Sequence, residues 1–157
     1  MHRLFPTMMA AAAAAAAMLP AGAGATDAVP VDPVAAWEAD RGVVLDAAEV
    51  DLDAFQWIAR PVVVFANSER DPAFAEQMEE LFAELDVLAD RDVVIVTDTD
   101  PGANTALRRK LRPRGFMLVL IGKDGQVKLR KPLPWTVREL SRSIDKMPMR
   151  RRELREE

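Results

Sequence analysis

The 157-residue sequence has no cysteine, no tyrosine and a single histidine, His2. Without thiols the chain can form no disulfide, no sulfur nucleophile and no cysteine-ligated zinc site. His2 lies in a segment that we expect to be removed, and its loss would also exclude a serine–histidine–aspartate triad. These absences exclude most covalent and acid–base catalysis and favour a non-catalytic protein.

The chain has one long apolar run, at its N-terminus. Met1-His2-Arg3 carries positive charge, residues 4–19 are apolar and rich in alanine, and small-x-small motifs end at Ala23 and Ala25. This pattern is typical of a secretory signal peptide, whereas a membrane anchor needs about 20 strongly apolar residues. We therefore expect residues 1–25 to be a signal peptide and the protein to be periplasmic or secreted. A retained N-terminal tail is the alternative.

Charge is divided between two parts of the sequence. Residues 26–105 contain 19 acidic and 4 basic residues, a net charge of −15, whereas residues 106–157 contain 16 basic and 6 acidic residues, a net charge of +10. Part of this imbalance must be neutralised inside a small domain. The remainder can present a charged surface to a partner.

Three apolar runs, at residues 62–66, 93–96 and 116–121, predict strands buried on both faces. The third run leads through Gly122-Lys123-Asp124-Gly125 into residues 126–130, where apolar and polar residues alternate. Asp-Gly is typical of a hairpin, because glycine accepts the positive φ that such turns need. Residues 116–130 thus predict a central strand that folds back onto an edge strand.

Apolar residues at helical spacing predict helices over 52–59, 72–89, the region of Leu107 and Leu111, and 136–147. Asp71 and Thr136 are the expected N-caps, and Pro148 is expected to end the last helix. Residues 26–50 are predicted to be a flexible leader, with at most a short helix and a short strand at 43–45. Residues 51–149 then form the domain, and residues 150–157 a charged tail.

The order of elements predicts an α/β fold with a mixed four-stranded sheet (βαβα-ββα) and helices on both faces, which is the thioredoxin architecture. The blocks RPVVVFA, GFMLVLIGKDGQVKLR, PWTVREL and SIDKMPMRRRE, together with Asp71-Pro72, resemble a bacterial exported family often called P-DUDES. That family shares its domain with the repeats of equarin and the sushi-repeat proteins. The resemblance implies export and a thioredoxin- or peroxiredoxin-like fold. It does not indicate a biochemical activity. The loop at 67–71 lacks the Cys-x-x-Cys of active thioredoxins.

Ligands of open α/β sheets gather at the carboxyl ends of parallel strands. Asn67, Ser68, Asp98 and Asp100 follow two predicted strands and form a candidate rim pocket, although the same residue types are common in helix caps and turns. Asp98 and Asp100 do not have the spacing of a calcium-binding loop. We predict neither a metal site nor a cofactor.

Arginines form the strongest surface signal and favour contacts to carboxylate or phosphate groups. Their alternative role is to neutralise the acidic half of the chain. We therefore expect an exported, non-catalytic binding module whose partner is an acidic envelope protein, a glycan or a lipid surface, and not nucleic acid. The alternatives are a redox-accessory or peroxiredoxin-like enzyme that uses the rim loops with an external thiol or metal, and a purely structural protein. The candidate partner-binding residues are Arg108, Arg109, Arg112, Arg114, Arg150, Arg151 and Arg152.

Overall fold

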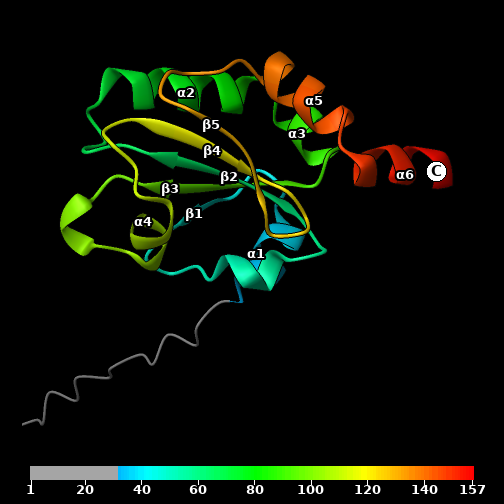
Figure 1. Ribbon diagram of the computed structural model, residues 1–157, viewed down its shortest axis with the longest axis horizontal. Coiled ribbons are helices and arrows are strands. Elements are labelled where there is room, and N and C mark those ends of the chain that lie inside the picture. Colours follow the sequence, from blue (N-terminus) through cyan, green and yellow to red (C-terminus); the bar gives the residue numbers. More distant parts are fainter. Residues whose placement is uncertain (1–31) are drawn as a thin grey trace, which may run out of the picture.

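The computed structural model describes residues 32–157 (Figure 1), so the predicted signal peptide lies outside the described residues. Five strands form one sheet in the order β1-β3-β2-β4-β5. The elements follow one another as α1 (Pro33–Ala39), β1 (Val44–Asp46), the 3₁₀ helix η1 (Leu52–Phe55), β2 (Arg60–Phe65), α2 (Pro72–Ala83), α3 (Leu85–Ala89), β3 (Val93–Asp98), the 3₁₀ helix η2 (Pro101–Ala103), α4 (Ala106–Leu111), β4 (Met117–Ile121), β5 (Val127–Lys131), α5 (Val137–Asp145) and α6 (Pro148–Glu156).

The sheet contains the four strands expected from the sequence and a fifth, β1, which matches the short strand expected at 43–45. β2 and β3 are parallel, with Val63 opposite Val96, and β2 pairs antiparallel with β4. β4 turns back into β5, so the hairpin prediction is confirmed. The prediction of a four-stranded sheet is corrected by β1, which pairs parallel with β3 and places Val44 beside Ile95.

The prediction of a flexible leader at residues 26–50 is wrong for residues 33–50, which belong to the folded domain. Trp37 of α1 is only 1% exposed. Its indole Nε1 donates to the carbonyl oxygen of Val93 at 3.0 Å, and its ring meets Phe55 edge-on with a centroid separation of 6.2 Å. The guanidinium of Arg41 lies 3.7 Å from the centre of the same ring. A large aromatic side chain with a satisfied N–H therefore anchors this segment.

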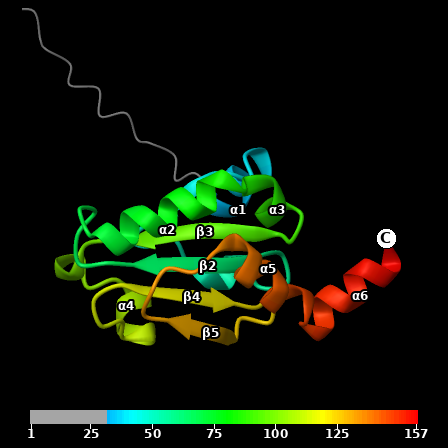
Figure 2. The same cartoon turned by 90° about the horizontal axis from the view of Figure 1, so that it is seen from above.

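Helices cover both faces of the sheet, as predicted (Figures 1 and 2). α2, α3 and α5 lie on one face, where Leu81, Leu140 and Ile144 pack against the strands. α4 lies on the other face, where Leu107 and Leu111 pack against Val63 and Val119. In both layers the strands supply mainly branched apolar side chains, which fill a pleated interface well.

Three predicted helices differ from the structure. The helix predicted for 72–89 is broken at Glu84, whose φ of −134° and ψ of 43° separate α2 from α3. Residues 52–59 form only the short 3₁₀ helix η1. α5 begins after the predicted N-cap Thr136, which forms a capping box with Glu139, but it ends at Asp145, and Pro148 is the first residue of α6. Proline fits the first helical turn because the N–H it lacks would have no partner there, so most of the predicted charged tail is helical.

We predict that Trp37→Ala lowers the free energy of unfolding by about 3 kcal/mol or more, because it removes a fully buried aromatic group. Urea unfolding followed by circular dichroism measures this loss. Trp57→Ala is a matched control, since Trp57 is 62% exposed, and it should cost less than about 1 kcal/mol. Equal stability of the Trp37 variant and the unchanged chain would show that residues 33–50 do not contribute to the domain.

Candidate functional site

The candidate rim residues do not form a pocket, because Asp98 is already occupied by partners from α4. Asp98 is 4% exposed. Its carboxylate accepts hydrogen bonds from Arg108 Nε at 2.7 Å and from Thr105 Oγ1 at 2.6 Å. Arg108 also donates to the carbonyl oxygen of Ala66 at 2.6 Å. This cluster joins α4 to the ends of β2 and β3, and neither Asp98 nor Arg108 is available to a ligand.

Two of the other rim residues, Ser68 and Asp100, accept hydrogen bonds within turns. Ser68 Oγ accepts a hydrogen bond from the backbone N–H of Arg70, and Asp100 Oδ1 accepts one from Gly102. Asn67, Ser68 and Asp100 are exposed. Within residues 32–157, no group of three or more histidine or acidic side chains is placed to hold a metal ion.

The opposite end of the sheet holds a network of ion pairs centred on Arg60, which is 1% exposed. Its Nη2 contacts both carboxylate oxygens of Glu153, at 2.9 and 3.1 Å, and its Nη1 donates to the carbonyl oxygen of Arg91. Lys123, in the β4–β5 turn, contacts Glu153 at 2.9 Å and Asp92 at 2.7 Å. The network therefore ties α6 to the start of β2 and to the hairpin.

Arg150 belongs to the same network, which corrects its assignment as a partner-binding residue. It is 3% exposed and lies 3.2 Å from Asp90 and 3.5 Å from Glu153. Arg151 and Arg152, one and two positions further along α6, are exposed. Helical geometry turns each successive side chain by about 100°, so adjacent arginines point in different directions.

The network lowers the pKa values of two carboxyl groups. Burial alone would raise the pKa of Glu153, but hydrogen bonds from Lys123 and Arg60, and their positive charge, outweigh burial and hold it below its ordinary value of 4.5. Burial would also raise the pKa of Asp92, but hydrogen bonds from Lys123 and Arg41, and their positive charge, outweigh burial and hold this pKa below its ordinary value of 3.8. Both groups therefore stabilise the folded state when they are ionised.

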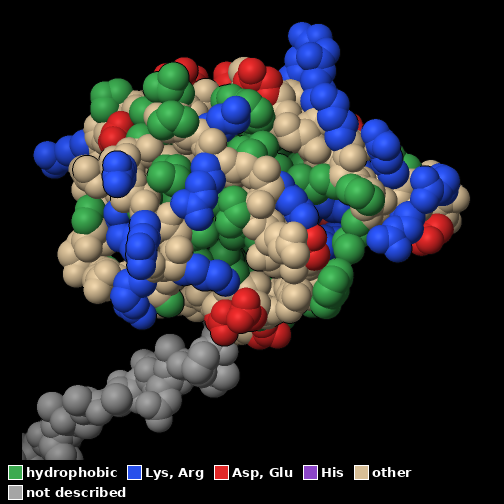
Figure 3. All heavy atoms as spheres, viewed as in Figure 1, with side chains coloured by type: hydrophobic (Ala, Val, Ile, Leu, Met, Phe, Trp, Pro, Cys, Tyr) green, Lys and Arg blue, Asp and Glu red, His purple; other side chains and the backbone are tan. Residues whose placement is uncertain are grey.

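Exposed cations gather on the side of the molecule formed by β5, α4 and the α5–α6 junction, which we call the β5 face (Figures 1 and 3). Figure 3 shows Lys and Arg side chains spread across this side with hydrophobic side chains between them, while most Asp and Glu lie near its margins. Of its cations, only Lys128 has a carboxylate partner in the described part of the chain, Asp124 at 2.6 Å. We define the cations of the β5 face by the elements that carry them, which are α4 and the segment after it, β5, and the α5–α6 junction with the start of α6. All are exposed except the half-buried Lys131, and they are Arg109, Lys110, Arg112, Arg114, Lys128, Arg130, Lys131, Lys146 and Arg152.

The β5 face therefore contains four of the predicted partner-binding residues, Arg109, Arg112, Arg114 and Arg152. Its other cations, Lys110, Lys128, Arg130, Lys131 and Lys146, were not among the predicted partner-binding residues. Lys128 and Arg130 lie on the predicted edge strand, where the alternation of charged and apolar residues was a usable signal, and Lys131 is the last residue of β5. Lys146 could not be placed beside them without knowing where α5 ends.

An open hollow of about 430 Å³ lies on the β5 face between β5 and the α5–α6 junction. Leu129, Trp135 and Met147 give it apolar surface, and Lys131 sits above the Trp135 ring at 4.1 Å from its centre. Lys128 and Lys146 also line it, and none of its lining residues is acidic. A second hollow of about 160 Å³ adjoins it and shares Lys128, Met147 and Pro148. We call the larger one the β5 hollow.

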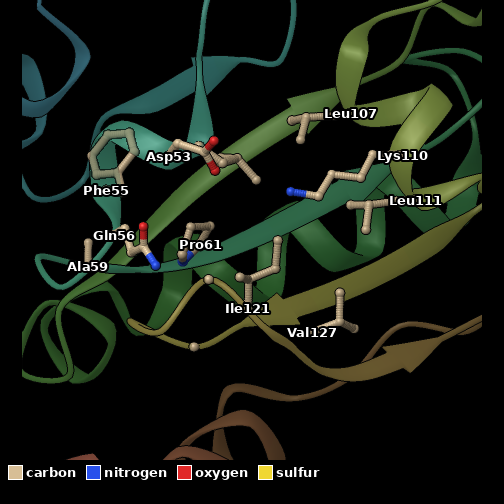
Figure 4. A pocket seen from close by; sticks show the side chains of 13 residues that line it. Asp53, Phe55, Gln56, Ala59, Pro61, Leu107, Lys110, Leu111, Ile121 and Val127 are labelled. Carbon is tan, nitrogen blue, oxygen red and sulfur yellow. The ribbon is translucent and has the colours of Figure 1, made fainter.

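A third, apolar pocket lies between η1, α4 and the β4–β5 turn (Figure 4). The side chains of Phe55, Leu107, Ile121 and Val127 surround it, and Lys110 lies at its border. Its volume of about 20 Å³ holds roughly one water molecule. In this form it has no room for an organic ligand.

With five mixed strands between two helical layers, the chain is a thioredoxin-like α/β domain. A solved structure of reduced 2-Cys peroxiredoxin from Plasmodium vivax is similar in fold, with 16% identity, a TM-score of 0.52 and coverage of 66% of this chain and 85% of that chain. Reduced desulfothioredoxin from Desulfovibrio vulgaris Hildenborough gives 20% identity, a TM-score of 0.49 and coverage of 68% and 98%. No curated protein matches the chain.

The family is identified by residues 51–153, which match the model described as Domain of unknown function (DUF4174). The chain belongs to this family. α1 and β1 precede the matched residues, whereas most of α6 lies within them. No described helix combines the length and the apolar character needed to cross a membrane.

We predict that Asp98→Ala lowers the free energy of unfolding by about 3 kcal/mol, because it leaves the largely buried side chain of Arg108, 9% exposed, without its counter-charge. Asp100→Ala, which removes only a turn contact, should cost about 1 kcal/mol. Urea unfolding of both variants measures the difference. An Asp98 variant as stable as the unchanged chain would favour a ligand-binding role for this carboxylate.

We also predict that stability falls as the pH drops below about 4.5, because a carboxyl group with a lowered pKa in the folded state loses its contribution as it is protonated. Glu153→Gln should lower stability at neutral pH by about 3 kcal/mol and flatten this acid dependence. Unfolding free energies measured from neutral pH to about pH 3 test this. Glu156→Gln on the same helix is the control and should leave the pH profile unchanged.

Proposed function

We propose that the domain is a non-catalytic binding module that recognises an acidic partner through the β5 face. The observation that carries this proposal is that eight of the thirteen cations without a carboxylate partner in residues 32–157 belong to the β5 face. Arg60, Arg91, Arg108 and Arg150 are paired with carboxylates inside the domain. Eight of the nine cations of the β5 face have no such partner among the described residues.

Unpaired cations on one face attract an anionic partner and orient its approach. Arginine adds planar, bidentate contacts to carboxylate or phosphate groups. Solvent-exposed charges at the border of an interface add only modest affinity in water. The hydrophobic surface between the cations supplies the contact area that charge alone does not.

We place this module in the periplasm or outside the cell, on the strength of the signal-peptide pattern in residues 1–25 and the resemblance to an exported family that shares its domain with equarin. The partner is then an acidic component of the envelope or extracellular space. The enzyme alternative gains no support from the rim, because Asp98 is occupied and the sequence contains no thiol.

Charge reversal on the β5 face tests the proposal. Lys131→Glu/Lys146→Glu should weaken binding of fluorescent poly-L-glutamate by at least about tenfold at low salt, since two cations on one face become anions. The measurement is fluorescence anisotropy at low and high salt. Arg70→Glu/Arg155→Glu makes the same change in net charge elsewhere and should alter affinity by less than about twofold. Equal losses in the two double variants would show that net charge, and not the β5 face, governs binding.

A further inference from the structure

β5 is the last strand of the sheet, and its outer edge is uncovered. The strand order ends with β5, and Figure 2 shows no element beyond it on that side. In an antiparallel pair, alternate residues direct their N–H and C=O groups away from the partner strand. In the described structure, the backbone of residues 127–131 makes no hydrogen bond with any element other than β4. The edge therefore offers free main-chain donors and acceptors.

The side chains beside this edge combine positive charge with apolar surface. The pairing of β4 with β5 shifts register between Leu120 and Ile121, so β5 carries one extra residue there. Lys128 and Leu129, consecutive in sequence, both line the β5 hollow, as expected where a bulge interrupts the alternation of faces. The edge thus has lysine and leucine on the same side, opposite Trp135 and Met147.

We propose that β5 is the docking edge for an extended acidic peptide segment, which adds to the sheet as a sixth strand and inserts an apolar side chain into the β5 hollow. This inference rests on the proposed function and specifies its partner. Main-chain groups at a sheet edge are matched by another polypeptide backbone, which a glycan or a lipid headgroup does not provide.

The positive charges of the β5 edge favour an incoming strand that carries negative charge. Lys128, Arg130 and Lys131 repel a second copy of β5, because like charges directly opposite in a sheet are unfavourable. A strand that alternates acidic and apolar residues places its carboxylates near these cations and its apolar side chains on one face. Met147 suits varied apolar anchors, because its unbranched thioether side chain adapts its shape.

The test compares three synthetic peptides with the purified chain. All three have blocked ends and alternate glutamate with valine. One is unmodified, and the other two are N-methylated at every second amide, one on each set of alternate amides, to cover both orientations. N-methylation removes main-chain donors and keeps all charges. We expect the unmodified peptide to bind and at least one methylated peptide to bind about tenfold more weakly or worse, because several main-chain hydrogen bonds are lost.

Hydrogen exchange supplies a second readout. The unmodified peptide should slow exchange of amides in residues 127–131 and leave the rim loop at 67–71 unchanged. Lys131→Glu/Lys146→Glu should abolish this protection, whereas Arg70→Glu/Arg155→Glu should retain it.

The outcomes separate this inference from the proposed function. Equal binding of all the peptides without protection of β5 would overturn strand addition and leave electrostatic docking in place. Binding of a sulfated glycan or of vesicles containing anionic lipid, with no peptide binding, would also overturn it and assign a different partner to the β5 face. Failure of every polyanion to bind, poly-L-glutamate included, would overturn both.

Discussion

The burial of Arg60 at the start of β2 is the constraint on which one end of the domain depends. A guanidinium cannot be deprotonated, so it stays in the interior only if its charge and donors are satisfied there. Glu153 in α6 supplies the negative counter-charge, and the carbonyl oxygen of Arg91 accepts a hydrogen bond from the Arg60 guanidinium. Because Lys123 shares Glu153, the hairpin joins the same arrangement. The start of β2, the hairpin and α6 are thus held together by one compensated charge.

This constraint gives a physical reason for two sequence blocks within the residues that match the family, RPVVVFA and SIDKMPMRRRE. Arg60 opens one block and Glu153 closes the other, and they meet in the folded chain at 2.9 Å. Arg150 and Asp145, from the second block, lie in the same network. These residues therefore hold the fold together, and the cations of the β5 face take no part in this network. Under the proposed function, structural and recognition roles are carried by different cations.

Most of the fold could be predicted from the sequence because its strands are continuous apolar runs and its turns contain glycine. The runs around Val63, Val94 and Val119 leave no other placement than the sheet interior. β1 was harder to predict, since three residues carry little pattern and its burial depends on pairing with β3. The leader was misjudged because Trp37 is a single aromatic residue in an Ala/Pro/Asp-rich segment. Its anchoring depends on the Val93 carbonyl, 56 residues away.

The candidate site was less predictable, because composition does not distinguish a paired cation from a free one. Arg150 and Arg152 differ only by two positions on a helix, yet one is buried against Asp90 and the other faces solvent. Which of them is buried follows from where α6 begins, and that depends on Pro148 starting a helix. Asp98 shows the same limit, since its partner Arg108 comes from the next helix. Whether a charged residue forms an internal ion pair or faces solvent is thus decided by its neighbours in the folded chain. Its charge alone does not distinguish these two roles.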